Sequence, residues 1–217
     1  MTPIKIDFVS DIACPWCAVG LSALEQAIER VKDEVSVEIH FQPFELNPKM
    51  PEEGEDIVEH LMNKYRLTPE QVEQNQQHIA QRGADVGFEF NMDGRKRTYN
   101  TFNAHRLLHW AGEEADAQAQ HRLKRHLLQA YFTEGKNPSD SLVLIEAARR
   151  SGLDAERAAE VLQKNEFADV VREREQHFLS QGIHSVPSVI FNQQFLLQGG
   201  QPVDTFERAL RQLAQES

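Results

Sequence analysis

Two periodicities alternate over the first part of the chain, and this alternation restricts the fold more than any other feature. In residues 4–9, IKIDFV, apolar side chains alternate with polar ones, which is typical of a strand. From Pro15 to Val31 the apolar residues recur every three or four positions, as on an amphipathic helix. Residues 35–41, VSVEIHF, then alternate again. Strand, helix and strand with short connections predict a βαβ unit whose two strands run parallel.

The middle of the chain is predicted to be almost wholly helical. Three prolines and a cluster of charges in residues 42–56 end the strand pattern. Residues 68–71, Thr-Pro-Glu-Gln, then have the form of a capping box with proline at the first helical position. Further helices are expected over residues 101–113, 117–133, 141–151, 154–164 and 166–181.

The C-terminal part returns to a mixed pattern. The segments SVIF and QFLLQ flank Asn192-Gln193, which predicts a β-hairpin, and a final helix follows. The simplest architecture is therefore an α/β fold in which an all-α segment interrupts one α/β domain. We place the α/β domain at residues 1–48 and 165–217 and the helical insertion domain at residues 49–164.

Charge and hydropathy exclude several classes of partner. The formal net charge of −11 argues against binding to nucleic acid or anionic lipid, because both require clustered Lys and Arg. No apolar run approaches the roughly 20 residues that span a bilayer. Asp7 and Asp11 interrupt the stretch where a signal peptide would need its apolar region. We expect a cytoplasmic protein without nucleic-acid or membrane partners, either a monomer or a homodimer.

Cys14 and Cys17, the two cysteines of the chain, are separated only by Pro15 and Trp16. A structural zinc site needs four ligands, and the chain has no second cysteine pair. The histidines of HRLLH, residues 105–109, lack the glutamate of a zincin motif. A structural disulfide here would close a very short loop, for which the entropic gain is small, and cytoplasmic thiols are kept reduced. We therefore predict no metal site and favour redox chemistry.

The position of the pair supports redox chemistry directly. Cys14 falls where the first predicted strand gives way to a helix, so the helix dipole and the unpaired N–H groups favour its thiolate. Cys17 lies one turn further along the helix, where it can attack a mixed disulfide at Cys14 and release the substrate. A C-x-x-C sequence after a strand in a βαβ pattern is typical of a thioredoxin-like redox motif.

Four segments make the sequence resemble a known family. They are SDIACPWCAVG (residues 10–20), NTFNAHRLLHWA (100–111), AYFTEGKNPSD (130–140), and GIHSVPSVIFN with QGGQP (within 182–202). In this order, and over nearly the whole chain, they are similar to the FrnE-like branch of the DsbA-family thiol–disulfide oxidoreductases. The resemblance implies a thioredoxin-like fold with an inserted all-α domain that covers the active site.

The resemblance also implies roles for individual residues. Cys14 matches the exposed nucleophile of the family, and Cys17 matches the resolving thiol. Val186-Pro187 matches a loop whose proline is cis and faces the cysteines, which leaves the backbone of Val186 free to pair with an extended substrate. The complete set of predicted substrate contacts is Val186, Pro187, Pro15, Trp16 and Asn103.

Two positions depart from the family pattern. Many thioredoxin-fold enzymes carry a buried carboxylate six residues before the first cysteine, as proton acceptor for the second, and here that residue is Phe8. If Phe8 packs inward, Asp7 faces the other way, and we expect Asp11 nearer the loop than the core. Trp16 stands where strongly oxidising periplasmic members carry histidine, and it adds no positive charge. The proton acceptor of Cys17 and the direction of exchange are therefore left open.

The predicted helix that begins near residue 101 is mostly explained by packing of its apolar face. Its first turn adds candidates to line a groove opposite the cysteines: Asn100, Phe102, Asn103 and His105.

Three functions fit these observations. The first is a protein dithiol–disulfide oxidoreductase that acts on protein or small-molecule disulfides and thiols, with no tightly bound cofactor and with glutathione as a candidate co-substrate. The second is a glutathione-dependent isomerase or transferase acting on small aromatic substrates. The third is a redox-gated chaperone or binding module. We favour the first, because the glutathione-dependent isomerases carry serine in place of the nucleophilic cysteine and this chain retains both cysteines.

Overall fold

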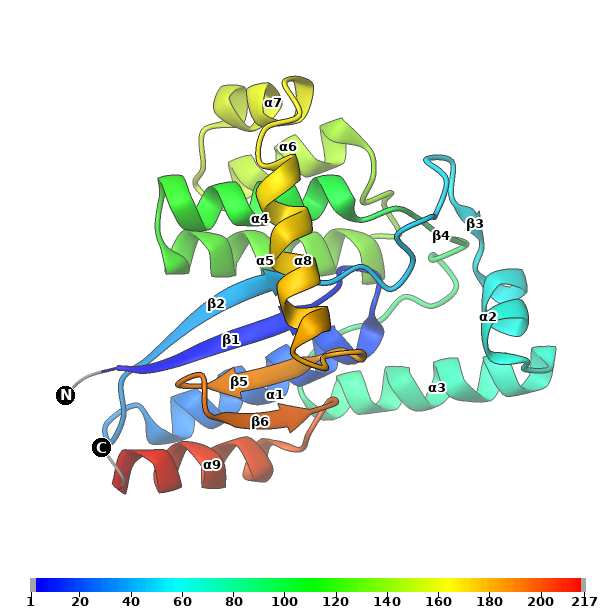
Figure 1. Ribbon diagram of the computed structural model, residues 1–217. Coiled ribbons are helices and arrows are strands. Elements are labelled where there is room, and N and C mark those ends of the chain that lie inside the picture. The colour runs from blue at the N-terminus through cyan, green and yellow to red at the C-terminus, as the bar shows by residue number, and fades with distance from the viewer. Residues whose placement is uncertain (1–2, 216–217) are drawn as a thin grey trace.

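A four-stranded mixed sheet lies at the centre of the protein in the computed structural model, which describes residues 3–215 (Figure 1). The strand order is β2-β1-β5-β6. The strands are β1 (Ile4–Ser10), β2 (Val37–Pro43), β5 (Ser188–Phe191) and β6 (Phe195–Gln198). β2 runs parallel to β1, which confirms the predicted βαβ unit, whereas β5 runs antiparallel to β1 and pairs with β6 as a hairpin.

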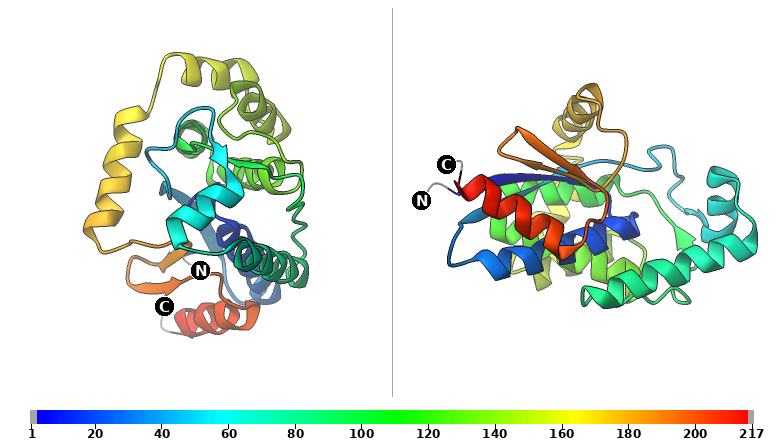
Figure 2. Two further views of the ribbon diagram at one scale, coloured as in Figure 1. Left: turned by 90° about the vertical axis from the view of Figure 1, so that its right-hand side faces the viewer. Right: turned by 90° about the horizontal axis from the view of Figure 1, so that it is seen from below.

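Helices cover both faces of this sheet. α1 (Pro15–Val31) and α9 (Val203–Gln215) pack against each other on one face, and α8 (Ala168–Ser180) crosses the other face (Figures 1 and 2). The apolar stripe of α9 explains its position, because Phe206 and Leu210 are fully buried. This arrangement of strands and helices confirms the predicted thioredoxin-like α/β fold.

The middle of the chain is helical, as predicted, with one small addition. Its helices are α2 (Ile57–Tyr65), α3 (Pro69–Asp85), α4 (Phe102–Glu114), α5 (Ala117–Phe132), α6 (Ser141–Arg150) and α7 (Ala155–Gln163). β3 (Glu55–Asp56) and β4 (Arg97–Thr98) form a two-residue antiparallel pair that the sequence did not predict. α4 and α5 pack beside β2, and α6 and α7 lie beyond them, whereas α2 and α3 project beyond the carboxyl end of β1 (Figure 1).

The helical segment and the sheet share one hydrophobic core. Ile6 of β1, Leu24 of α1, Leu107 of α4 and Leu127 of α5 all belong to the same buried cluster. The helices therefore pack directly onto the βαβ unit. The division into residues 1–48 with 165–217 and residues 49–164 stays a prediction.

Local signals in the sequence located several element ends correctly. The capping box at the start of α3 is present, since Thr68 accepts a hydrogen bond from the N–H of Gln71 and the Gln71 side chain accepts one from the N–H of Thr68. Asn192 and Gln193 have φ of 47° and 58°, which suits the tight turn of the predicted hairpin. β2 begins and ends two residues later than predicted, because its register with β1 runs from Val37 to Pro43.

No helix within residues 3–215 is long and apolar enough to cross a bilayer.

Candidate active site at the start of α1

Cys14 is the N-cap residue of α1, and no disulfide joins it to Cys17 in this structure. Its Sγ donates to the carbonyl oxygen of Val186 at 3.6 Å, which joins the cysteine pair to the loop before β5. The resemblance implied an exposed nucleophile, but Cys14 is only 4% exposed and Cys17 is fully buried. The contact with Val186 contributes to this burial.

The Val186–Pro187 peptide bond is cis, as the resemblance implied. The proline ring packs on α1 at Gly20, where a Cβ atom would lie 3.0 Å from Pro187 Cγ. Gly200 packs equally closely on Trp16, since a Cβ there would lie 3.1 Å from Trp16 Cε3. These two glycines hold the loop and the cysteine motif together, and the sequence analysis did not assign them this role.

Trp16 also contacts the projecting pair of helices. Its ring lies 5.8 Å from the ring of His78 on α3, measured between centroids. At the end of α2, Lys64 Nζ donates to Leu46 O and Asn47 Oδ1. Burial lowers the pKa of Lys64, and the nearby charges of Asp11 and Cys14 oppose that shift. α3 thus contacts the cysteine motif through His78, and the end of α2 brings Lys64 close enough for its charge to interact with those of Asp11 and Cys14.

Cys17 is a thiol that resists ionisation. Burial raises its pKa well above the usual range, and the neighbouring Cys14 raises it further, while Lys124 lowers it. Lys124 lies on α5 and is itself fully buried. Lys124 was not among the site residues predicted from the sequence, although it falls on the same helical stripe as Leu123, Leu127 and Leu128, which are all buried.

Phe8 occupies the interior below the cysteines, as expected. It lies opposite Phe41 in the sheet, and their rings meet edge to face with centroids 5.7 Å apart. Asp7 is partly exposed, and its Oδ1 accepts a hydrogen bond from Gln42 Nε2. Neither residue places a carboxylate beside Cys17.

Asp11 lies in the loop between β1 and α1, and its side chain is buried there, with the residue 1% exposed. Its Oδ1 accepts from the N–H of Ala13 and lies 3.3 Å from His105 Nε2, and its Oδ2 accepts from the N–H of Leu46 at 2.7 Å. Burial raises the pKa of Asp11, but His105 and the Leu46 N–H outweigh it, so the pKa lies below its usual value. Asp11 therefore fixes the loop that carries Cys14.

Replacing Asp11 by asparagine is expected to lower the free energy of unfolding at pH 7 by about 2 kcal/mol, because hydrogen bonds to a buried charge are lost. The pKa of Asp11 is lower in the folded protein than in the unfolded chain, so its contribution is present above about pH 4 and fades as the pH falls through the folded value. Urea unfolding from pH 7 to pH 3 should show the difference between native protein and Asp11→Asn shrinking. A difference that stays constant over this range would contradict the assignment.

The candidates on α4 are placed in different surroundings. The His105 ring contacts the carboxylate of Asp11, which in turn holds the loop that carries Cys14. Asn103 Oδ1 accepts from Arg106, whose guanidinium also donates to the carbonyls of Val161 and Glu166 beyond α4. Asn103 thus supports the packing of α7, and its substrate contact stays a prediction.

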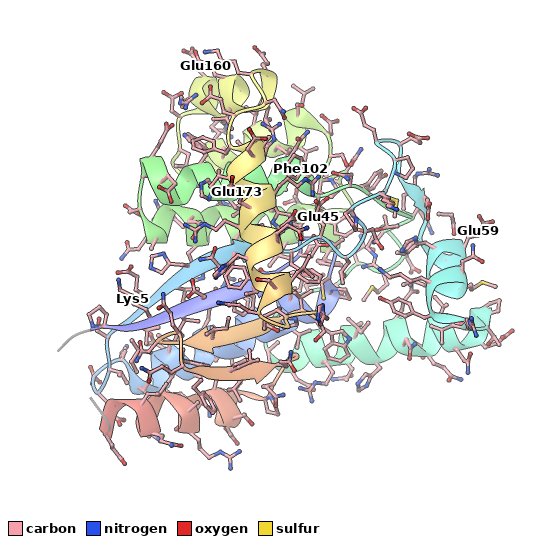
Figure 3. All side chains as sticks on the ribbon, in the orientation of Figure 1. Lys5, Glu45, Glu59, Phe102, Glu160 and Glu173 are labelled. Carbon is pink, nitrogen blue, oxygen red and sulfur yellow. The ribbon has the colours of Figure 1, made fainter. Side chains whose placement is uncertain are left out.

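The remaining two candidates of this group, Asn100 and Phe102, also have partners. Asn100 Nδ2 donates to Met50 O. The guanidinium of Arg172 on α8 lies 3.7 Å from the centroid of the Phe102 ring, and Arg172 also pairs with Glu45. Phe102 and Glu45 are labelled beside α8 in Figure 3. Among residues 3–215 no cluster of His, Cys, Asp or Glu could hold a metal ion.

Comparison with known proteins agrees with this geometry. The family model of the DSBA-like thioredoxin domain matches residues 5–211. The uncharacterized protein YwbO of Bacillus subtilis (strain 168) is 29% identical over 208 residues, which are 95% of this chain and 96% of YwbO. The crystal structure of a probable DsbA oxidoreductase from Streptomyces coelicolor superposes with a TM-score of 0.89 at 29% identity, covering 99% of this chain and 91% of that one. The cytosolic disulfide reductase DsbM from Pseudomonas aeruginosa, solved with GSH, has a TM-score of 0.66 at 18% identity, covering 97% and 99%.

Proposed function

Because the chain belongs to the DSBA-like thioredoxin domain family, we propose that it is a dithiol–disulfide oxidoreductase that uses Cys14 as nucleophile and Cys17 as resolving thiol. One observation carries this proposal: Cys14 caps α1 and contacts the carbonyl of Val186, next to the cis Pro187, with Cys17 buried directly behind it. The same arrangement supports Val186, Pro187, Pro15 and Trp16 as the residues around a bound disulfide.

The proposed cycle has two exchange steps. The Cys14 thiolate attacks one sulfur of a substrate disulfide, forms a mixed disulfide and releases the other sulfur as a thiolate. Cys17, once deprotonated, attacks the Cys14 sulfur, which forms the Cys14–Cys17 disulfide and releases the second substrate thiolate. The substrate gains two electrons and the protein loses two. The cycle runs in reverse when the protein oxidises a dithiol.

The burial of Cys17 favours this division of roles. Cys14 keeps a small exposed surface of 4%, where a substrate sulfur can approach, whereas Cys17 is fully buried in the core. Its raised pKa keeps Cys17 protonated while Cys14 makes the first attack.

We also propose glutathione as the small-molecule thiol that regenerates the pair, and the cytoplasm as its location. Both agree with DsbM from Pseudomonas aeruginosa, a cytosolic disulfide reductase of the same fold that has been solved with GSH. The retained Cys14 disfavours the glutathione-dependent isomerase as the main activity.

The direct test is reduction of the insulin disulfides by dithiothreitol, followed by precipitation of the free B chain. The native protein is expected to shorten the delay before precipitation in proportion to its concentration. A protein alkylated at its cysteines before the assay serves as control. A delay identical for native and alkylated protein would contradict the proposed activity.

A further inference from the structure

Lys124 is a buried lysine in an unusual environment. It is fully buried on α5, and its Nζ has no hydrogen-bond partner among the described residues. The ammonium lies 5.8 Å from the centroid of the Phe41 ring, which gives it a cation–π contact but no acceptor. A charged ammonium in such a site loses its hydrogen bonds to water, and the cation–π contact alone does not replace them. The site therefore favours release of a proton from Lys124.

The charges that act on Lys124 come from the cysteine motif. Burial lowers the pKa of Lys124 to about 8. The negative charges of Cys17, Asp11 and Cys14, in decreasing order of strength, oppose this shift. In the other direction, Lys124 lowers the pKa of Cys17. The Phe41 ring that faces Lys124 lies opposite Phe8 in the sheet, and both rings belong to the same buried cluster as Cys17. Lys124 and Cys17 are thus both fully buried and close enough for their charges to interact.

Other groups near Cys17 are less suited to accept its proton. Both oxygens of Asp11 already accept backbone N–H groups, and Oδ1 also faces His105. These contacts hold the pKa of Asp11 below its usual value, so its carboxylate is a weak base. Phe8 offers no titratable group. A neutral lysine with a pKa near that of the medium is a much better acceptor.

We propose that Lys124 is the proton acceptor for Cys17 in the resolving step, an inference that rests on the proposed function. In the mixed disulfide the neutral amine of Lys124 comes within hydrogen-bond reach of the Cys17 thiol, a contact that this structure does not contain, takes its proton and becomes an ammonium. The Cys17 thiolate then attacks the sulfur of Cys14 in the mixed disulfide, and the substrate thiolate leaves. The ammonium stays beside the reacting sulfurs until it returns its proton to the medium.

Ellman's reagent separates the two steps. Attack by Cys14 releases the first thionitrobenzoate, and resolution by Cys17 releases the second, so stopped-flow absorbance gives two phases. In Lys124→Met the first phase should be largely retained, and the second should slow by about 100-fold, the lower end of a general-base contribution. The second phase should recover as the pH rises and hydroxide replaces the lysine.

Arg95→Met is the matched control. Arg95 is also a buried cation over aromatic rings, with its guanidinium 5.6 Å from the Tyr131 centroid and 5.2 Å from the Phe132 centroid. This variant should keep both phases. An unchanged second phase in Lys124→Met, with its native pH dependence, would overturn the proposal. Absence of the first phase in native protein would instead refute the function itself.

A native-protein measurement decides the question if Lys124→Met does not fold. The rate of the second phase should level off above a midpoint near pH 8, the pKa of Lys124. A rate that rises in proportion to hydroxide through that range would overturn the proposal.

Discussion

Replacing Cys14 by serine is expected to abolish disulfide exchange, in both the reducing and the oxidising direction. A serine hydroxyl is not ionised at neutral pH and cannot form the mixed disulfide, so Cys17 has no partner sulfur to attack. Cys17 cannot substitute for Cys14, because it is fully buried and its pKa is raised. The insulin assay should give the rate of dithiothreitol alone.

The same variant should fold at least as well as the native protein. Cys14 is the N-cap of α1 but makes no capping hydrogen bond through its side chain, and serine is among the preferred N-cap residues. Thermal unfolding should therefore show an equal or higher midpoint. Full activity in Cys14→Ser would contradict the assignment of the nucleophile.

Replacing Cys17 by serine is expected to stop the cycle after its first step. Cys14 remains able to attack, so a mixed disulfide forms, but nothing inside the protein resolves it. The variant should accumulate one substrate thiol per chain on Cys14, visible by intact mass and reversed by dithiothreitol. Turnover should fall to the rate at which external thiols release the adduct.

Cys17→Ala is the matched control for this trapping experiment. Cys17 is buried in the core cluster, so the serine hydroxyl adds a polar group there, whereas alanine leaves only a small void. Both variants should trap the same adduct. If neither accumulates it and both turn over at the native rate, Cys17 is not the resolving thiol.

Much of the fold could be predicted from short-range patterns. Apolar residues recur every two positions in β1 and β2 and every three to four positions in α1. These periodicities predicted the βαβ unit correctly, because each of the three elements buries one face in a single core. The capping box at Thr68 and the turn at Asn192 are local hydrogen-bonding and backbone preferences, so they can be read without tertiary contacts.

The surroundings of Cys17 could not be predicted in this way. The pairing of Asp11 with His105 joins residues 94 positions apart, and nothing local to either residue indicates it. β3 and β4 pair only because the segments before α2 and before α4 meet. Lys124 did leave a signal, a cation on the apolar stripe of α5, but a buried lysine is rare enough that the pattern favours exposure. The cis bond at Pro187 was predicted from the resemblance and not from the residues themselves.

The central claim, that Cys14 and Cys17 form one working redox pair, is tested most directly by equilibration with a series of reduced and oxidised glutathione. Acid quenching, alkylation and intact mass should show a single two-electron transition between dithiol and intramolecular disulfide in the native protein. Cys14→Ser and Cys17→Ser should both lose this transition, and Cys17→Ser should instead carry glutathione on Cys14. A native protein that forms no Cys14–Cys17 disulfide at any glutathione ratio would contradict the account.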